Sequence, residues 1–323
     1  MGIDTPVHAM SKLISKGIEH IASKESLPNT NKSTQEVVKR IFFIKENFEP
    51  FNPNAKFAFS DVHSLYDNVN THEGVNIVKR ELEKNPSPLG MSAEYLAEGL
   101  KLCLELNCIK FKDRYYKPCR GCAQGTCPAC TFTDMWVGDI VKKHIETNRI
   151  DSVLFTIYRD DGKDILLNGE QDANALKEHM DNLHENLEWD VNVTSEGGYL
   201  DLWLMLKDGE IQWKTYTKTP PLFLQRSSCH DPLIFKGIYK GVGHRLRLTN
   251  STNEGFKEAV EEYSRAMATS GYKYKQVKRE LMKYESVDVK ELASTKKQGK
   301  RTLLELNYSG YFPMTQESLI QGK

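Results

Sequence analysis

Two groups of residues in this chain could do chemistry, and they would bind different kinds of ion. The first group consists of two Cys-x2-Cys pairs separated by four residues, namely Cys119, Cys122, Cys127 and Cys130. The second group is acidic and combines Asp61 with the adjacent pair Asp160 and Asp161, about 100 residues later. Thiolates are ligands for zinc, whereas carboxylates suit hard cations such as Mg²⁺.

The cysteine spacing is unusual for a zinc site. The two pairs of a structural zinc module are typically separated by about 12–20 residues, whereas only Ala-Gln-Gly-Thr separates them here. A link this short could still close a tight knuckle, so a four-cysteine zinc-binding module remains an alternative. The cysteines number seven, an odd total, and the N-terminus lacks the apolar core of a secretory signal. Both observations favour reduced thiols inside a cell.

The acidic residues lie at the ends of predicted strands. Asp61 closes a short apolar run, residues 55–62, that is typical of a buried strand. Asp160 and Asp161 lie at the tip of a strong strand–turn–strand pattern. If the two strands are neighbours, three carboxylates meet at one end of a sheet, where two divalent cations could promote phosphoryl transfer. Taken alone, however, Asp-Asp-Gly is more typical of a hairpin turn.

Hydrophobic periodicity predicts the elements that carry these residues. We expect helices over residues 8–24, 37–48, 71–84, 92–107, 131–147, 171–187 and most of 231–284. We expect a strand at 55–62 and hairpins that turn at Lys112–Asp113, Asp161–Gly162 and Asp208–Gly209. This order indicates an α+β fold in which helices cover one face of an antiparallel sheet.

Charge is balanced over the chain but unevenly distributed. Lys and Arg total 44, as do Asp and Glu, so the total charge predicts no polyelectrolyte partner. Residues 159–201 carry twelve acids and three bases, whereas residues 205–250 carry eight bases and three acids. An acidic zone beside a basic one suits a metal site next to a phosphate track, although two solvated surfaces would look the same. No run of 18 apolar residues occurs, so we expect no membrane partner.

Five segments in order resemble the motifs of reverse transcriptases. "FSDVHSLYDNV" and "YRDDG" resemble motifs A and C, and "GCAQGTCPACTFTDMWVG" between them resembles motif B of Penelope-like reverse transcriptases. Gly121, Ala123, Gly125, Thr126, Ala129 and Gly138 fall into the register of that motif. Further on, "YLDLWLMLKDGEIQWKTYTKTP", "SSCHDP" and "GHRLRL" resemble the strands and thumb that follow in the family. The resemblance covers roughly residues 8–313.

The resemblance implies a fold and an activity. The expected fold is a right-hand polymerase palm, an antiparallel sheet with helices on one face, followed by a helical thumb. Its parts are expected at residues 1–50 (a helical lead-in), 51–230 (palm), 231–290 (thumb) and 291–323 (a basic tail). The expected activity is RNA-directed DNA polymerisation in a retroelement, with an RNA template, a DNA primer and dNTP as partners and an intracellular, nuclear location.

The resemblance also assigns roles to residues. Asp61 and Asp160 would coordinate two Mg²⁺ ions, which Mn²⁺ could replace, with Asp161 as a supporting ligand. Nucleotide contacts would come from Tyr66, which would exclude a 2′-hydroxyl, and from Gln124, Gly125 and Lys218. Thumb contacts to the phosphate backbone would come from His244, Arg245 and Arg247. Each role has an alternative. Tyr66 could be a core aromatic, Gln124 a solvated loop amide and Lys218 an exposed hairpin lysine. The three thumb residues could belong to a solvated helix surface.

The resemblance implies a different role for the loop that contains the cysteines. The small residues Gly121, Ala123 and Gly125 would let the backbone approach a nucleotide closely, and the four thiols keep no assigned role. The basic fingers region of the family would precede His8, and its GIY-YIG nuclease would follow Phe312, after which 11 residues remain. We therefore expect a truncated copy, and a non-catalytic nucleic-acid-binding remnant is the second alternative.

Overall fold

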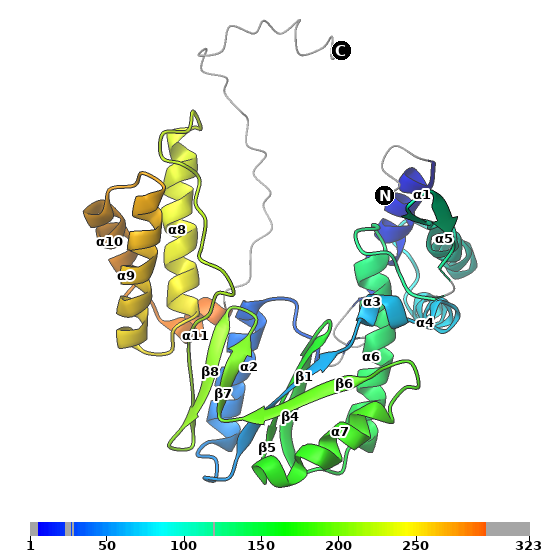
Figure 1. Cartoon of the computed structure of the whole chain (residues 1–323), viewed down its shortest axis with the longest axis horizontal. Coiled ribbons are helices and arrows are strands. Elements are labelled where there is room, and N and C mark those ends of the chain that lie inside the picture. Colours follow the sequence, from blue (N-terminus) through cyan, green and yellow to red (C-terminus); the bar gives the residue numbers. More distant parts are fainter. Residues whose placement is uncertain (1–5, 23–26, 28, 119, 295–323) are drawn as a thin grey trace, which may run out of the picture.

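A four-stranded antiparallel sheet forms the centre of the molecule (Figure 1). The computed structural model describes residues 6–22, 27, 29–118 and 120–294. The strands follow in the order β4 (Ser152–Tyr158), β5 (Asp161–Leu166), β1 (Lys56–Val62) and β6 (Trp189–Thr194). A separate sheet joins β7 (Glu196–Tyr199), β8 (Leu202–Lys207) and β9 (Glu210–Thr215). The expected α+β class with antiparallel pairing is confirmed.

Both faces of the central sheet are buried, so the prediction of helices on one face is wrong. Neighbouring residues of a strand point to opposite faces, and both Phe57 and Ala58 of β1 are fully buried. Phe57 joins a core with α2 (Thr34–Phe48), the β7–β9 sheet and α11 (Val289–Ser294). Ala58 joins a second core, to which several helices contribute, among them α1 (Pro6–Ile18), α4 (Thr71–Lys84), α5 (Ala93–Glu105), α6 (Ala129–Thr147) and α7 (Ala173–Asp181).

The helices α1, α4 and α5 form a group of their own within that second core. Glycines allow α1 and α5 to approach closely, because a Cβ on Gly17 would clash with Leu96 and one on Gly99 would clash with Ile14. A short hairpin, β2 (Ile109–Phe111) and β3 (Arg114–Tyr116), follows α5. The range expected to be palm thus contains a helical group that packs with the N-terminal helix.

The helices of the expected thumb lie on the other side of the sheet from that group (Figure 1). They are α8 (Pro232–Leu248), α9 (Asn253–Thr269) and α10 (Tyr274–Met282), and they share a third core. The chain then returns to the sheet, because the Gln35 amide of α2 donates hydrogen bonds to the carbonyls of Leu292 and Ala293 in α11. The basic tail after residue 294 lies outside the described residues.

Three short helices complete the described elements: Glu19–Ile21, α3 (Leu65–Asn68) and Gly169–Asp172. No helix in the described ranges is both long enough and apolar enough to cross a bilayer.

The turn between β4 and β5 lies earlier than its sequence suggests. We expected Asp161–Gly162 to form the turn, but Gly162 is buried and pairs with Ser60 on one side and Ile157 on the other. Arg159 makes the reversal instead, with a positive φ of 57°. Asp160 therefore lies in the turn, whereas Asp161 is the first residue of β5.

Two adjacent charged residues of β5 are buried below the turn. The Lys163 ammonium lies 3.7 Å from the centroid of the Phe57 ring, and burial lowers the pKa of Lys163 well below its usual value. Asp164 is 1% exposed, and burial raises its pKa to about 7. One carboxyl oxygen accepts the Ile165 N–H at 2.7 Å, and the other has no hydrogen-bond partner.

Asp164→Asn should flatten the pH dependence of stability. As the pH rises from about 4 towards 7, the carboxyl of the unfolded chain releases its proton before that of the folded chain, so the free energy of unfolding falls. Asparagine cannot titrate and removes this loss. Urea unfolding at several pH values measures the effect, with the exposed Asp151→Asn as control. An unchanged pH slope in Asp164→Asn would show that Asp164 is already ionised in the folded chain.

Candidate active site

Strand pairing brings the predicted catalytic carboxylates together. Asp61 of β1 lies directly opposite Asp161 of β5, and the Val62 N–H donates to the Asp160 carbonyl at 3.3 Å. Asp61 is exposed, whereas Asp160 and Asp161 are partly buried. Residues about 100 positions apart in the sequence therefore form one acidic edge.

The three carboxylates of this edge lie close enough to repel one another. Burial, and then the negative charge of Asp160, raise the pKa of Asp61. Burial, followed by Asp160 and Asp61, raises the pKa of Asp161. The Lys218 ammonium opposes both shifts. The mutual repulsion creates a negative potential that a bound cation would relieve.

The donor atoms suit a hard divalent cation. Carboxylate oxygens are the protein ligands that Mg²⁺ prefers, and it completes its shell with water and phosphate oxygens. Among the described residues, no three His, Cys, Asp or Glu side chains already surround one point at ligand distance. The three carboxylates therefore fit such ions by chemistry and position rather than as a closed cage.

A fourth carboxylate, Asp190, lies on the other side of Asp61. It is the partner of Asp61 across the β1–β6 ladder, and its side chain pairs with His63 Nε2 at 2.8 Å. The sequence interpretation placed no strand here. The alternation of Trp189, Val191 and Val193 was the signal that could have located it.

Tyr66 lies in the short helix α3 that follows β1, near Arg159 of the turn that also contains Asp160. Burial, and then its contact with the Cys130 thiol, raise the pKa of Tyr66 to about 12. Arg159 of the β4–β5 turn and Asp134 of α6 also act on its hydroxyl. Burial raises the pKa of Asp134 to about 6, and its Oδ1 is buried without a partner. Tyr66 therefore stands where β1, α6 and the β4–β5 turn meet.

The cysteine-containing loop is fastened to the backbone around Tyr66. The Cys122 N–H donates to the Tyr66 carbonyl at 2.7 Å, and the Gly121 N–H donates to the Val69 carbonyl at 2.9 Å. Gly121 has a φ of 88°, and a Cβ there would lie 2.8 Å from the Tyr66 carbonyl oxygen. Gly121 is therefore required by its close approach to the α3 backbone, while Gln124 and Gly125 are exposed beyond it.

The described thiols of this loop have separate surroundings. Cys122 is buried, with its pKa raised to about 12, whereas Cys130 is exposed beside Tyr66. The Cys127 carbonyl accepts a hydrogen bond from the Ser15 hydroxyl at 3.0 Å. Cys119 lies outside the described residues. Among the described residues, the three thiols do not converge on a metal-binding point.

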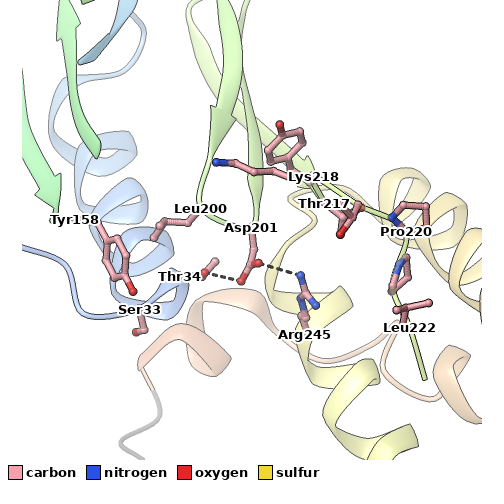
Figure 2. A pocket seen from close by; sticks show the side chains of 13 residues that line it. Ser33, Thr34, Tyr158, Leu200, Asp201, Thr217, Lys218, Pro220, Leu222 and Arg245 are labelled. Carbon is pink, nitrogen blue, oxygen red and sulfur yellow. Dashed lines mark hydrogen bonds and ion pairs between the residues drawn. The ribbon is translucent and has the colours of Figure 1, made fainter. Parts of the chain in front are cut away.

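A cavity of about 760 Å³ lies between the start of α2, the segment after β9 and α8 (Figure 2). Its walls include Tyr158 at the end of β4, Lys218 after β9, and Asp201. Figure 2 shows Asp201 between Thr34 and Arg245. Its carboxylate accepts the Thr34 hydroxyl at 2.8 Å and pairs with the Arg245 guanidinium at 2.9 Å. Asp201, which sequence reasoning did not select, thereby joins α2, the β7–β8 turn and α8.

The three thumb residues expected to track a phosphate backbone have different surroundings. Arg245 is paired with Asp201, and its side chain is 41% exposed and lines the cavity. Arg247 is 8% exposed and donates to the Val287 carbonyl at 2.8 Å, so it stabilises the thumb interior. The His244 ring packs edge-on against Tyr284, with centroids 4.8 Å apart.

The exposed cations of α8 are instead Lys236 and Lys240. Their spacing of four residues, which puts them on one helix face, was the available sequence signal.

Comparison with known proteins identifies the fold. Neither a family model nor a curated protein matches the sequence. The structure is similar to telomerase from Candida albicans in complex with the TWJ fragment of telomeric RNA, with a TM-score of 0.61 and 13% identity over 89% of this chain and 53% of that one.

Apo telomerase from Candida tropicalis has a TM-score of 0.52 and 13% identity over 88% of this chain and 55% of that one. The chain spans about half the length of these telomerases. At such identity the similarity shows the fold alone, and that fold is of the polymerase type with a palm and a thumb.

Gly121→Ala should destabilise the chain more than Gly90→Ala. Both glycines have positive φ, but a Cβ at Gly90 meets nothing within 4 Å, whereas one at Gly121 meets the α3 backbone. Alanine at positive φ is strained in both variants. The difference between their free energies of unfolding therefore measures the clash of a Cβ at Gly121 with the α3 backbone. We expect about 1–3 kcal/mol of additional loss in the free energy of unfolding, measured by urea denaturation. Equal losses would indicate that the loop moves away from α3 at no cost.

Proposed function

We propose that this chain is an RNA-directed DNA polymerase of the Penelope-like retroelement type, which extends a DNA primer on an RNA template with dNTP and acts in the nucleus. One observation carries the proposal: Asp61 and Asp161 oppose each other across a strand pair, with Asp160 in the adjoining turn, whose Arg159 also lies near the Tyr66 hydroxyl. The polymerase-type fold supports it. The motif order resembles that of the family from motif A to the thumb.

The carboxylates would form the metal-binding part of the site. Asp61 and Asp160 would hold two Mg²⁺ ions, with Mn²⁺ able to replace them, and Asp161 would support them through its position opposite Asp61. When bound, such ions stabilise the charge that develops as a primer hydroxyl attacks a nucleotide phosphate. Partial burial of Asp160 and Asp161 strengthens their attraction for a cation relative to open solvent.

The other residues orient the substrates. Lys218 lies near enough to oppose the carboxylate charges, so its ammonium can pair with a phosphate at the same edge. Gln124 and Gly125 are exposed on the loop that is fastened to Tyr66 and can contact an incoming nucleotide. Positioning and electrostatic stabilisation are the main contributions that this chemistry requires from a protein.

Asp160→Asn should abolish primer extension while leaving the binding of a primer–template duplex intact. The amide keeps the shape of the turn but removes one negative ligand, so we expect a loss of about 10²-fold or more in rate. Extension assays with Mg²⁺ and with Mn²⁺ measure it, and Asp151→Asn, before β4, is the matched control. Extension absent from the parent chain, together with retained duplex binding, would leave only the non-catalytic remnant.

Tyr66→Ala should weaken discrimination against ribonucleotides, whereas Tyr66→Phe should preserve it. The proposal assigns selectivity to the ring and not to the hydroxyl, which already contacts Cys130. Loss of a steric contact of this size changes the ratio of kcat/KM for dNTP over NTP by about 10- to 200-fold. Single-nucleotide incorporation kinetics measure that ratio. Equal ratios in the parent and in Tyr66→Ala would contradict the assignment.

A further inference from the structure

The β2–β3 hairpin carries large apolar side chains that the described protein does not cover. All six residues of the two strands are exposed. The apolar and aromatic members keep roughly half or more of their surface in solvent: Ile109 56%, Phe111 62%, Tyr115 68% and Tyr116 47%. An isolated two-stranded hairpin is marginally stable in water, so a hairpin of this composition is expected to gain stability from a partner.

The charge of the hairpin indicates which class of partner it would bind. Residues 109–120 contain five bases and one acid, which are Lys110, Lys112, Arg114, Lys117, Arg120 and Asp113. Strand pairing places Lys110 opposite Tyr115 and Phe111 opposite Arg114. The Lys110 ammonium lies 5.7 Å from the centroid of the Tyr115 ring. Two of the three cross-strand pairs thus combine an aromatic ring with a cation.

Single-stranded nucleic acid matches this combination. Its bases stack on aromatic rings and its phosphates pair with nearby cations, without a requirement for sequence. An apolar protein surface would match the rings but would leave the cations without counter-charges. A duplex would pair with the cations but keeps its bases stacked internally.

The hairpin also connects to the candidate active site. A cavity of about 670 Å³ at its base is lined by Lys117, Arg120 and Gly121. The charges of its lining balance, because Lys101, Lys117 and Arg120 are matched in number by Glu98, Glu105 and Glu185. The Gly121 N–H donates to the carbonyl of Val69, directly after α3, so the cavity reaches from the hairpin to the loop that lies against α3.

We propose that the β2–β3 hairpin binds the unpaired part of the RNA template before it enters the active site. This identification of the strand rests on the proposed function. The hairpin belongs to the group of α1, α4 and α5, and Figure 1 shows that group on the opposite side of the sheet from α8–α10. Under the proposed function the α8–α10 side would hold the copied duplex, so the uncopied strand would arrive on the side of the hairpin.

The test measures how much an unpaired template end adds to binding. Dissociation constants are determined by fluorescence anisotropy for the full chain with a blunt primer–template duplex. They are then determined for the same duplex with a 5′ template overhang of about eight nucleotides, within the usual site size for such surfaces. The overhang should tighten binding by the parent chain, and Phe111→Ala with Tyr115→Ala should reduce that gain by about 10-fold or more. Affinity for the blunt duplex should not change.

A matched control and a second variant keep the test decisive. Phe43→Ala with Tyr95→Ala removes two aromatic rings that are 53% and 59% exposed on other elements, and it should leave the gain unchanged. Replacing Lys110, Lys112 and Arg114 by alanine should make the binding of the overhang less sensitive to salt. The slope of the logarithm of the binding constant against the logarithm of the salt concentration should fall in magnitude by about two.

Three outcomes would overturn the proposal. The first is that the overhang does not increase the affinity of the parent chain. The second is that it increases the affinity of the hairpin variants as much as that of the parent chain. The third is that the hairpin variants differ from the parent chain in oligomeric state, measured by light scattering, and not in binding. None of these measurements requires catalysis, so failure of primer extension remains a separate result.

Discussion

The structure depends on one strand that is paired on both sides. β1 lies between β5 and β6, and this pairing sets Asp61 opposite Asp161 and opposite Asp190. Like charges directly opposite one another destabilise a ladder. The ends of the same strands compensate, because Phe57 and Ala58 are buried in the cores on the two faces of the sheet. The fold thus uses burial at one end of β1 to hold an unfavourable acidic arrangement at the other.

Tyr66 shows how separate segments define one position. Its helix continues from β1, its carbonyl accepts the N–H of Cys122, and its hydroxyl lies at Cys130 and Arg159. The loop with the cysteines therefore positions Tyr66 through backbone hydrogen bonds. It also determines where α6, which carries Cys130, begins. Buried Cys122 behaves as a small apolar side chain there. Metal coordination by sulfur is not needed to explain the described part of this loop.

Local sequence patterns located most elements because periodicity and turn residues are local properties. The strand that carries Asp61, the helices at 71–84 and 92–107, and the turn at Asp208–Gly209 match the structure closely. The proximity of Asp61 to the Asp160–Asp161 pair was inferred from a resemblance, since no local pattern specifies which strands are neighbours.

The errors come from partners that lie far away in the sequence. Arg247 looks like a surface cation in the sequence, but it is buried and donates to the Val287 carbonyl. The consecutive apolar residues Phe57, Ala58 and Phe59 did contain the signal for a sheet buried on both faces, which alternation alone would not give.

The return of the chain to α2 has a consequence for the thumb. The thumb core contains residues between 223 and 284, and the palm resumes at α11. Between α8 and α9, Ser251 exchanges hydrogen bonds with the backbone of Trp213 in β9. The thumb segment is therefore attached to the rest of the molecule at two places, before α9 through Ser251 and after α10 through α11. Cutting the loop between α9 and α10 would leave each half covalently attached to an anchored segment, so a nicked chain could keep its palm assembled.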